Sequence, residues 1–182
     1  MKKQLLLTAA LMLIGIVAMA NCGNGKRSDI PAAQQQTDTT AAAEQDKEMA
    51  PDFSLTDING KTFTLSSLRG KIVVIDFWGS WCGWCIKGMP EMKRYYEKYK
   101  GKLEIVGVDC GDTQEKWKAA VSQLKLPWIH VYNPKGIGDI TGTYAIQGFP
   151  TKCIVGKDGE LLKVVIGEDP AFYTALDEIM KD

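Results

Sequence analysis

The organisation of the whole chain follows from nine residues, Phe77-Trp78-Gly79-Ser80-Trp81-Cys82-Gly83-Trp84-Cys85. The apolar run that leads into them, residues 71–78, is rich in β-branched and aromatic side chains and predicts a buried β-strand. A helix-like pattern follows over residues 86–99. Two cysteines separated by two residues, where a strand ends and a helix begins, can close a small disulfide. The first sulfur then lies at the positive end of the helix, which favours its thiolate. These local features predict thiol–disulfide exchange chemistry.

Composition and charge fit an ordinary globular domain with extra residues at the N-terminus. The chain has 182 residues, of which 45% are hydrophobic and 24% charged, so a sizeable core is possible. Its formal net charge is zero, which gives no indication of nucleic-acid binding or of a polyanionic substrate. An odd number of cysteines with one close pair indicates a catalytic pair plus single thiols, not a multi-disulfide scaffold. The five are Cys22, Cys82, Cys85, Cys110 and Cys153.

Residues 1–21 have the layout of a secretory signal peptide. Met1-Lys2-Lys3 precede an apolar run that ends at Ala20 and is short for a transmembrane span. Two outcomes stay open. Ordinary cleavage would leave Asn21 as the first residue of a soluble periplasmic protein. The tail that ends in Cys22 instead resembles a bacterial lipoprotein signal, in which the cysteine is acylated. We expect lipidation of Cys22.

Residues 22–50 predict a flexible tether. The segment is polar, low in complexity and poor in large apolar residues, so burial cannot offset the entropy of ordering it. A flexible chain of this length would span roughly 30 Å on average. That reach is enough to hold a catalytic domain, expected over residues 51–182, clear of a membrane surface.

The remaining sequence alternates strand and helix patterns. A β-hairpin is predicted over residues 53–65 with its turn at Asn59-Gly60. The strand of residues 71–78 follows, and then a helix over residues 83–99 that Pro90 should kink. The later patterns predict, in order, a strand 103–108, a helix capped by Asp112 with Glu115 and ending near Leu124, an edge strand 128–132, a short helix 140–144, a hairpin of strands 151–155 and 161–165, and a last helix after Asp169-Pro170. This order predicts an α/β fold with a central mixed sheet flanked by helices.

These elements resemble the thioredoxin superfamily, and most closely its exported, membrane-tethered TlpA/ResA-like branch. The resemblance covers about residues 50–182 and is carried by residues 76–85, by Pro90 and by Tyr144-Ala145-Ile146-Gln147-Gly148-Phe149-Pro150-Thr151. The N-terminal hairpin is also similar to that of AhpC/TSA-type, peroxiredoxin-related proteins. The resemblance implies a thioredoxin fold with an added N-terminal β-hairpin.

The resemblance also implies roles for the site residues. Cys82 would be the exposed nucleophile, and Cys85 would be the buried resolving cysteine that displaces the target from a mixed disulfide. Pro150 matches the cis-proline of the family, which lies beside the cysteine pair and presents backbone to the substrate. The substrate surface would comprise Trp81, Gly83, Trp84, Phe149 and Pro150.

Asp76, six residues before Cys82, matches the buried acid of ordinary thioredoxins. A carboxylate in so apolar a strand should have a raised pKa, which would allow it to exchange a proton with Cys85. The alternative is a strand-end residue that bonds nearby backbone. The tethered reductases often carry a Glu three residues after the second cysteine, where this chain has Gly88.

The other conspicuous side chains have structural interpretations. Cys110 and Cys153 are expected on the two strands that flank residues 71–78. The backbones of these strands would lie nearly 10 Å apart, which is beyond disulfide reach, so both cysteines are expected to be buried free thiols. The sharper alternative makes Cys110 an accessory redox cysteine. His130 is assigned to the predicted edge strand. Trp117 and Trp128 are expected in the core.

Together these features predict an enzyme, an envelope thiol–disulfide oxidoreductase that reduces protein disulfides through Cys82 and Cys85. Its expected partners are oxidised or cysteine-containing envelope proteins such as apocytochrome c, a transmembrane thiol donor of the DsbD/CcdA kind, and the membrane through Cys22. No cofactor, metal or nucleic acid is expected.

Two other functions of this fold remain as alternatives. Peroxide reduction would need a Pro-x-x-x-Thr-x-x-Cys loop, which residues 78–85 lack. Metal or copper delivery would need more ligands, or a wider cysteine spacing with a partner histidine. The direction of electron flow is not readable from Gly83-Trp84.

Overall fold

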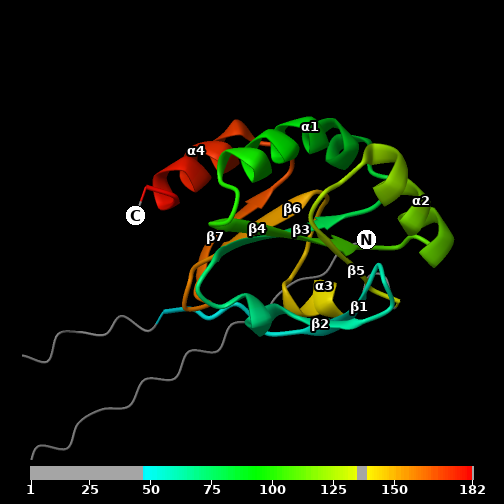
Figure 1. Ribbon diagram of the computed structural model, residues 1–182, viewed down its shortest axis with the longest axis horizontal. Coiled ribbons are helices and arrows are strands. Elements are labelled where there is room, and N and C mark those ends of the chain that lie inside the picture. The colour runs from blue at the N-terminus through cyan, green and yellow to red at the C-terminus, as the bar shows by residue number, and fades with distance from the viewer. Residues whose placement is uncertain (1–46, 135–138, 182) are drawn as a thin grey trace, which may run out of the picture. The chain divides into compact units, whose positions relative to one another are not determined.

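The computed structural model describes residues 47–134 and 139–181, and Cys22, the predicted signal peptide and most of the predicted tether lie outside these ranges. The described part is built on a seven-stranded mixed sheet in the order β2-β1-β5-β4-β3-β6-β7 (Figure 1). The strands are β1 (Ser54–Asp57), β2 (Thr62–Thr64), β3 (Ile72–Trp78), β4 (Leu103–Asp109), β5 (Ile129–Tyr132), β6 (Thr151–Val155) and β7 (Leu161–Ile166). The helices are the 3-10 turn η1 (Leu65–Leu68), α1 (Gly83–Lys98), α2 (Gln114–Leu124), α3 (Ile140–Thr143) and α4 (Pro170–Ile179). The predicted α/β plan with a mixed sheet is confirmed.

Strand β3 is the centre of the sheet, and every one of its residues is buried. It pairs in parallel with β4 on one side and antiparallel with β6 on the other. Because side chains alternate along a strand, Val74, Asp76 and Trp78 point to one face of the sheet, and Ile75 and Phe77 point to the other. The predicted buried strand is therefore confirmed.

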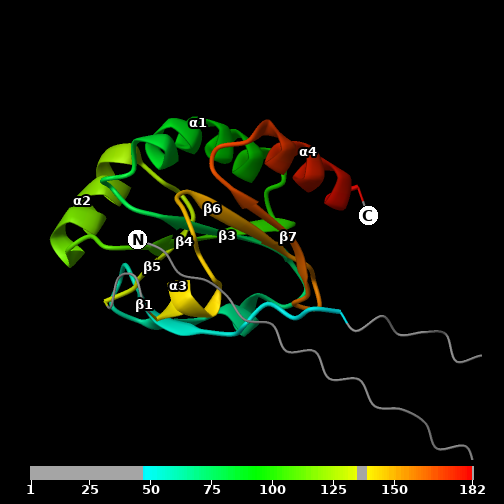
Figure 2. The same ribbon diagram turned by 180° about the vertical axis from the view of Figure 1, so that it is seen from behind.

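Helices α1, α2 and α4 cover one face of the sheet and α3 lies on the other, as both views show (Figures 1 and 2). The core on the first face joins Val74 and Trp78 of β3 to Met89 of α1, Trp117 of α2 and Phe172 of α4. The core on the second face contains Val73, Ile75 and Phe77 of β3, together with Leu65 of η1 and Ile140 of α3. Asp76 alternates with Val74 and Trp78, so it faces the side of the three helices.

Two predictions about local structure were wrong. Strand β5 is not an edge strand, because β1 pairs with it through Thr56 and Tyr132 and so extends the sheet beyond it. Asp112 does not cap α2. The N-cap is Thr113, whose side chain accepts a hydrogen bond from the Lys116 amide, and the carboxylate of Asp112 turns to the active-site loop instead. The predicted cap at Asp169 is confirmed, since its side chain accepts from the Ala171 amide.

The fold begins slightly earlier than predicted. The carbonyl of Glu48 accepts a hydrogen bond from the Leu161 amide, and the amide of Ala50 donates to the Gly159 carbonyl. The last residues of the predicted tether therefore pair with the β6–β7 hairpin. No helix within residues 47–134 and 139–181 is both long enough and apolar enough to cross a bilayer.

The flanking cysteines lie where the sequence predicted. Cys153 is in β6, Cys110 directly follows β4, and both are buried free thiols on either side of β3. Burial raises the pKa of both thiols, that of Cys153 to about 12. Trp117 and Trp128 are buried as predicted.

Candidate active site

Cys82 and Cys85 form a disulfide at the point where β3 has ended and α1 begins. Cys82 is the N-cap of α1, and its sulfur accepts a hydrogen bond from the Cys85 amide at 3.1 Å. A cap residue normally uses an oxygen for this purpose, because the first amides of a helix have no partner within the helix. The sulfur of Cys82 therefore lies at the positive end of α1, where a thiolate is stabilised.

Neither cysteine is exposed in the disulfide form. The exposed fraction is 6% for Cys82 and 3% for Cys85, so the prediction of an exposed Cys82 is wrong for this form. The physical reason is that the sulfur of Cys82 turns inward to the helix, toward Cys85 and its amide. The surface here is formed by two indoles, since Trp81 is 53% and Trp84 62% exposed.

The loop before α1 is held by contacts with the segment that follows β4. Asp112 accepts hydrogen bonds from the amide and the hydroxyl of Ser80, both at 2.6 Å. The indole Nε1 of Trp81 donates to the carbonyl of Cys110 at 3.0 Å. These bonds hold Trp81 in place immediately before the first cysteine. The sequence pattern gave no sign of the role of Asp112, because its position before α2 equally suits a helix cap.

The Phe149–Pro150 peptide bond is cis, as the resemblance implied. Its surroundings are ordered, because the carbonyl of Pro150 accepts from the Gly167 amide at 2.7 Å and the hydroxyl of Thr151 donates to the Gly148 carbonyl at 2.7 Å. The ring of Phe149 contacts the ring of Trp81. The structure thus brings the predicted substrate residue Phe149 against the loop of the cysteine pair.

Asp76 is 1% exposed, in the interior of β3 and on the same sheet face as the core cluster that contains Cys85. Burial raises its pKa to about 6, against the opposing effect of Lys152 and with a further increase from Glu168. One of its carboxylate oxygens has no hydrogen-bond partner among the described residues. The predicted raised pKa is confirmed, whereas the alternative of a strand-end residue is wrong.

Two charged residues near Asp76 were not predicted from the sequence. Lys152, in β6, is the direct cross-strand partner of Asp76, and Glu168 forms an ion pair with Lys152. A signal for Lys152 existed, since it is a lysine inside a run that otherwise predicts a buried strand. Glu168 had no such signal, because an acid just before a helix cap is ordinarily a solvated residue.

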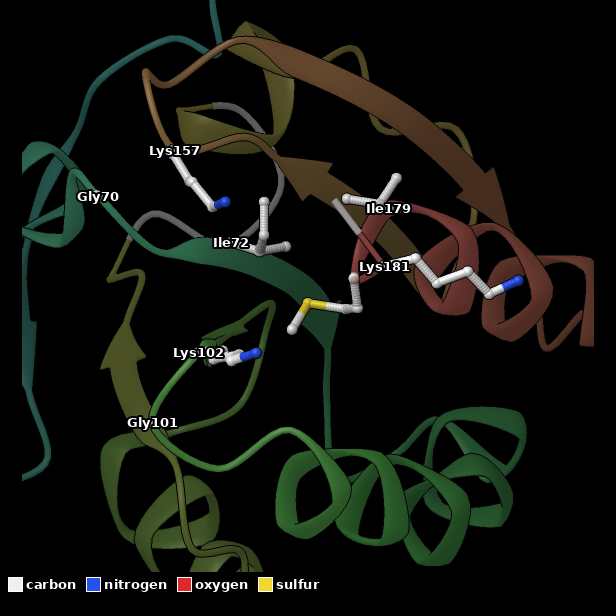
Figure 3. A pocket seen from close by; sticks show the side chains of 8 residues that line it. Gly70, Ile72, Gly101, Lys102, Lys157, Ile179 and Lys181 are labelled. Atoms are coloured by element: carbon white, nitrogen blue, oxygen red, sulfur yellow. The ribbon is translucent and has the colours of Figure 1, made fainter.

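A pocket lies at the opposite end of β3 from the disulfide (Figure 3). It reaches Ile72, the first residue of β3, about 20 Å from Trp78 at the rise of an extended strand. Its lining is Gly70, Ile72, Gly101, Lys102, Lys157, Ile179, Met180 and Lys181. None of the predicted site residues is among them.

The AhpC/TSA family is matched over residues 47–164, which is more than half of the chain. The chain belongs to the AhpC/TSA family. The thiol–disulfide oxidoreductase ResA of a Bacillus cereus strain is 43% identical over 122 residues, which cover 65% of this chain and 68% of that protein. Together with the Cys82–Cys85 disulfide, this similarity makes the protein an enzyme, a thiol–disulfide oxidoreductase of the thioredoxin type.

Solved structures agree with this assignment. A thiol:disulfide interchange protein DsbE from Chlorobium tepidum, described as putative in its own name, matches with a TM-score of 0.67 at 29% identity over 74% of this chain and 94% of that one. The exposed lipoprotein thioredoxin Etrx1 of Streptococcus pneumoniae matches with a TM-score of 0.61 at 26% identity over 70% of this chain and 99% of that one. The thioredoxin fold implied by the sequence is confirmed.

The AhpC/TSA match spans the disulfide, Asp76, the cis-proline and Lys152, whereas Glu168 lies beyond its end. The peroxide-reductase alternative lacks its nucleophile loop in this member of the family. Within residues 47–134 and 139–181, no three His, Cys, Asp or Glu side chains gather where they could hold a metal ion.

Proposed function

We propose that this oxidoreductase reduces protein disulfides in a bacterial envelope, with Cys82 as nucleophile and Cys85 as resolving cysteine. The observation that carries the proposal is the position of the Cys82 sulfur at the N-cap of α1, where it accepts the Cys85 amide. A thiolate formed there is stabilised by the helix end, whereas Cys85 has no such position.

The reaction consists of two exchange steps. In the reduced enzyme the Cys82 thiolate attacks one sulfur of a target disulfide, so that a mixed disulfide forms and the first target sulfur leaves as a thiolate. Cys85 then loses its proton to Asp76, and its thiolate attacks the sulfur of Cys82. The Cys82–Cys85 disulfide forms and the second target thiolate leaves. Two electrons have passed from the enzyme to the target.

Substrate contact would involve the exposed indoles and the cis peptide. Trp81 and Trp84, which directly precede Cys82 and Cys85 in the sequence, present exposed apolar surface, and Phe149 contacts Trp81. Backbone next to Pro150 would pair with an extended segment of the target. The targets are cysteine-containing envelope proteins, apocytochrome c among them. Regeneration of the dithiol requires two electrons from another dithiol, for which a transmembrane donor of the DsbD/CcdA kind is suited.

The envelope location is supported by the N-terminal sequence and by one relative. The signal-like residues 1–21 end directly before Cys22, and Etrx1 is by its name an exposed lipoprotein thioredoxin. Acylation of Cys22 would anchor the domain to a membrane through the segment that follows. Mass spectrometry of the mature protein tests this part, because an unmodified N-terminal Asn21 rules out the anchor.

The enzymatic part is tested by trapping. Cys85→Ala should accumulate mixed disulfides with envelope proteins, because Cys82 can attack but nothing resolves the product. Cys82→Ala is the matched control and should trap none. The direction of transfer follows from the measured reduction potential and from insulin reduction. A strongly oxidising potential without insulin reduction would contradict a reducing role.

A further inference from the structure

Lys152 is an almost fully buried lysine opposite the buried acid. It is paired in register with Asp76 across the antiparallel β3–β6 ladder, and its side chain is 3% exposed. Directly opposite residues on one sheet face have Cβ atoms about 5 Å apart. A buried ammonium group needs a compensating negative charge. Its ion-pair partner is Glu168, whose Oε2 lies 2.6 Å from the Lys152 Nζ.

Glu168 contacts three elements. Its Oε1 accepts a hydrogen bond from the Tyr173 hydroxyl of α4 at 2.8 Å, while its Oε2 accepts from Lys152 of β6. The third contact is with α1, because a Cβ added to Gly88 would lie only 2.2 Å from the Glu168 Oε2. The carboxylate therefore occupies the space that a side chain at position 88 would fill.

This location is one helical turn from the resolving cysteine. Residues three apart in a helix lie on the same side with about 5–6 Å between their Cβ positions, so Gly88 follows Cys85 along the inner face of α1. The side chain of Glu168 is 16% exposed, against 3% for Lys152, so the carboxylate is the member of this ion pair that reaches solvent. The chain thus places the carboxylate of Glu168 at the position of Gly88, one helical turn from Cys85, although α1 itself has a glycine there.

The charges that act on Asp76 come from few groups. Lys152 lowers the pKa of Asp76 and Glu168 raises it. The other titratable groups that interact with Asp76 are the Cys110 and Cys153 thiols and the Tyr173 hydroxyl, and burial raises the pKa of each, so all three are neutral near pH 7. The balance between Lys152 and Glu168 therefore determines the electrostatic field at Asp76.

We propose that Glu168 is a positioning residue, which acts through Lys152 to set the protonation of Asp76 while Cys85 attacks Cys82. This inference rests on the proposed roles of Cys85 and Asp76. Glu168 neutralises Lys152 and fixes its ammonium group. Without that carboxylate, the uncompensated positive charge of Lys152 favours the ionised form of Asp76 more strongly.

The two members of the ion pair act in opposite directions. Glu168→Gln keeps the shape of the side chain and removes its charge, so the pH at which Asp76 titrates should fall by about one unit. Lys152→Met removes the positive charge, so that pH should rise by about one unit. A purely structural role for the pair would not give shifts of opposite sign.

The test follows the resolving step directly. The full chain carrying Cys22→Ser is reduced and mixed with a stoichiometric amount of Ellman's reagent. The first thionitrobenzoate leaves when Cys82 attacks, and the second leaves when Cys85 resolves the mixed disulfide. The rate of the second release is measured from pH 4 to pH 9. Glu178→Gln, an exposed residue of α4 with the same change of charge, is the control and should reproduce the parent profile.

Opposite displacements of the Glu168→Gln and Lys152→Met profiles support the proposal. Profiles that coincide with the parent, or that move in the same direction, overturn it. Failure of the proposed function itself gives a different result, because the parent protein would then release no second thionitrobenzoate that depends on Cys85.

Discussion

The indole of Trp81 meets the ring of Phe149 edge to face, with ring centroids 5.2 Å apart. The two residues come from different parts of the chain, the loop before α1 and the cis peptide before β6. Trp81 is also bonded to the Cys110 carbonyl, so the contact is anchored on the side of β4. The surface next to the disulfide is therefore one connected aromatic patch and not two independent side chains.

Loss of this aromatic contact should weaken the use of protein substrates. Phe149 belongs to the proposed substrate surface, and losing one aromatic contact with the substrate, worth about 0.5–1.5 kcal/mol, should raise the KM for a protein disulfide about 2- to 10-fold in Phe149→Ala. Reaction with Ellman's reagent, which is too small to need the patch, should change little. Steady-state kinetics with both substrates check this. Leu162→Ala removes an exposed apolar side chain of β7 and is the control. Equal losses with both substrates would show that the variant had damaged the redox pair instead.

Gly88→Ala should act on Glu168 without altering any charge. The new methyl group would fall 2.2 Å from the Glu168 Oε2, and the flexible carboxylate is the group that yields. The resolving-step profile should therefore move to lower pH, as for Glu168→Gln. Helix propensity favours alanine by about 1 kcal/mol, so the variant should remain folded.

Gly142→Ala is the matched control for this substitution, because a Cβ there meets no atom within 4 Å. The pH profile of its second thionitrobenzoate release should coincide with that of the parent. If the Gly88→Ala profile also coincides with the parent, the carboxylate does not influence Asp76 from this position.

The buried charge of Asp76 should reduce stability at high pH. Its pKa in the folded protein is about 6, above the ordinary value of 3.8, so folding binds a proton between these two values. The stability contribution is complete below pH 4 and is lost as pH rises through 6. At about 1.4 kcal/mol per pKa unit, about 2 kcal/mol should be lost between pH 4 and pH 8.

Asp76→Asn should remove that loss. Urea unfolding of the oxidised parent and variant at pH 4 and pH 8 measures it, because contributions from other groups cancel in the difference. The free energy of unfolding of the variant, relative to that of the parent, should be about 2 kcal/mol higher at pH 8 than at pH 4. The same variant should also slow the release of the second thionitrobenzoate. If the variant and the parent differ in free energy of unfolding by the same amount at pH 4 and at pH 8, then Asp76 is not buried as an ionised group.

The sequence predicted the redox pair and its setting well because those features are local. A cysteine pair after an apolar strand fixes the strand, the helix start and the cap within a few residues of Cys82. The cis-proline and the acid of β3 were identified by resemblance. Burial of Cys82 could not be predicted, because it depends on how the sulfur turns once the disulfide has formed.

The charged group around Asp76 depends on long-range contacts that no sequence pattern records. Lys152 meets Asp76 only through the register of β3 with β6, and Glu168 reaches Gly88 only because α4 packs against the same sheet face as α1. The interior position of β5 has the same origin, since the pairing of β1 with β5 joins residues far apart in the chain.

His130 should make the protein sensitive to acid. It is buried in β5, with its ring beside the rings of Trp78 and Trp128 at centroid distances of 6.0 and 5.8 Å. Burial lowers its pKa to about 4 from 6.5, so the unfolded chain binds the proton more readily. The stability contribution of the neutral ring is complete above pH 6.5 and is lost as pH falls towards 4.

His130→Phe keeps an aromatic ring between the two indoles and removes the titration. Between pH 7 and pH 5 the free energy of unfolding of the parent should fall by about 2 kcal/mol more than that of the variant. Urea unfolding at the two pH values measures this, and a constant packing cost of the larger ring cancels in the comparison. Ile129→Val, in the same strand, alters no ionisable side chain and should lose the same stability as the parent. A parent and a His130→Phe variant that lose equal stability would place the imidazole in contact with water.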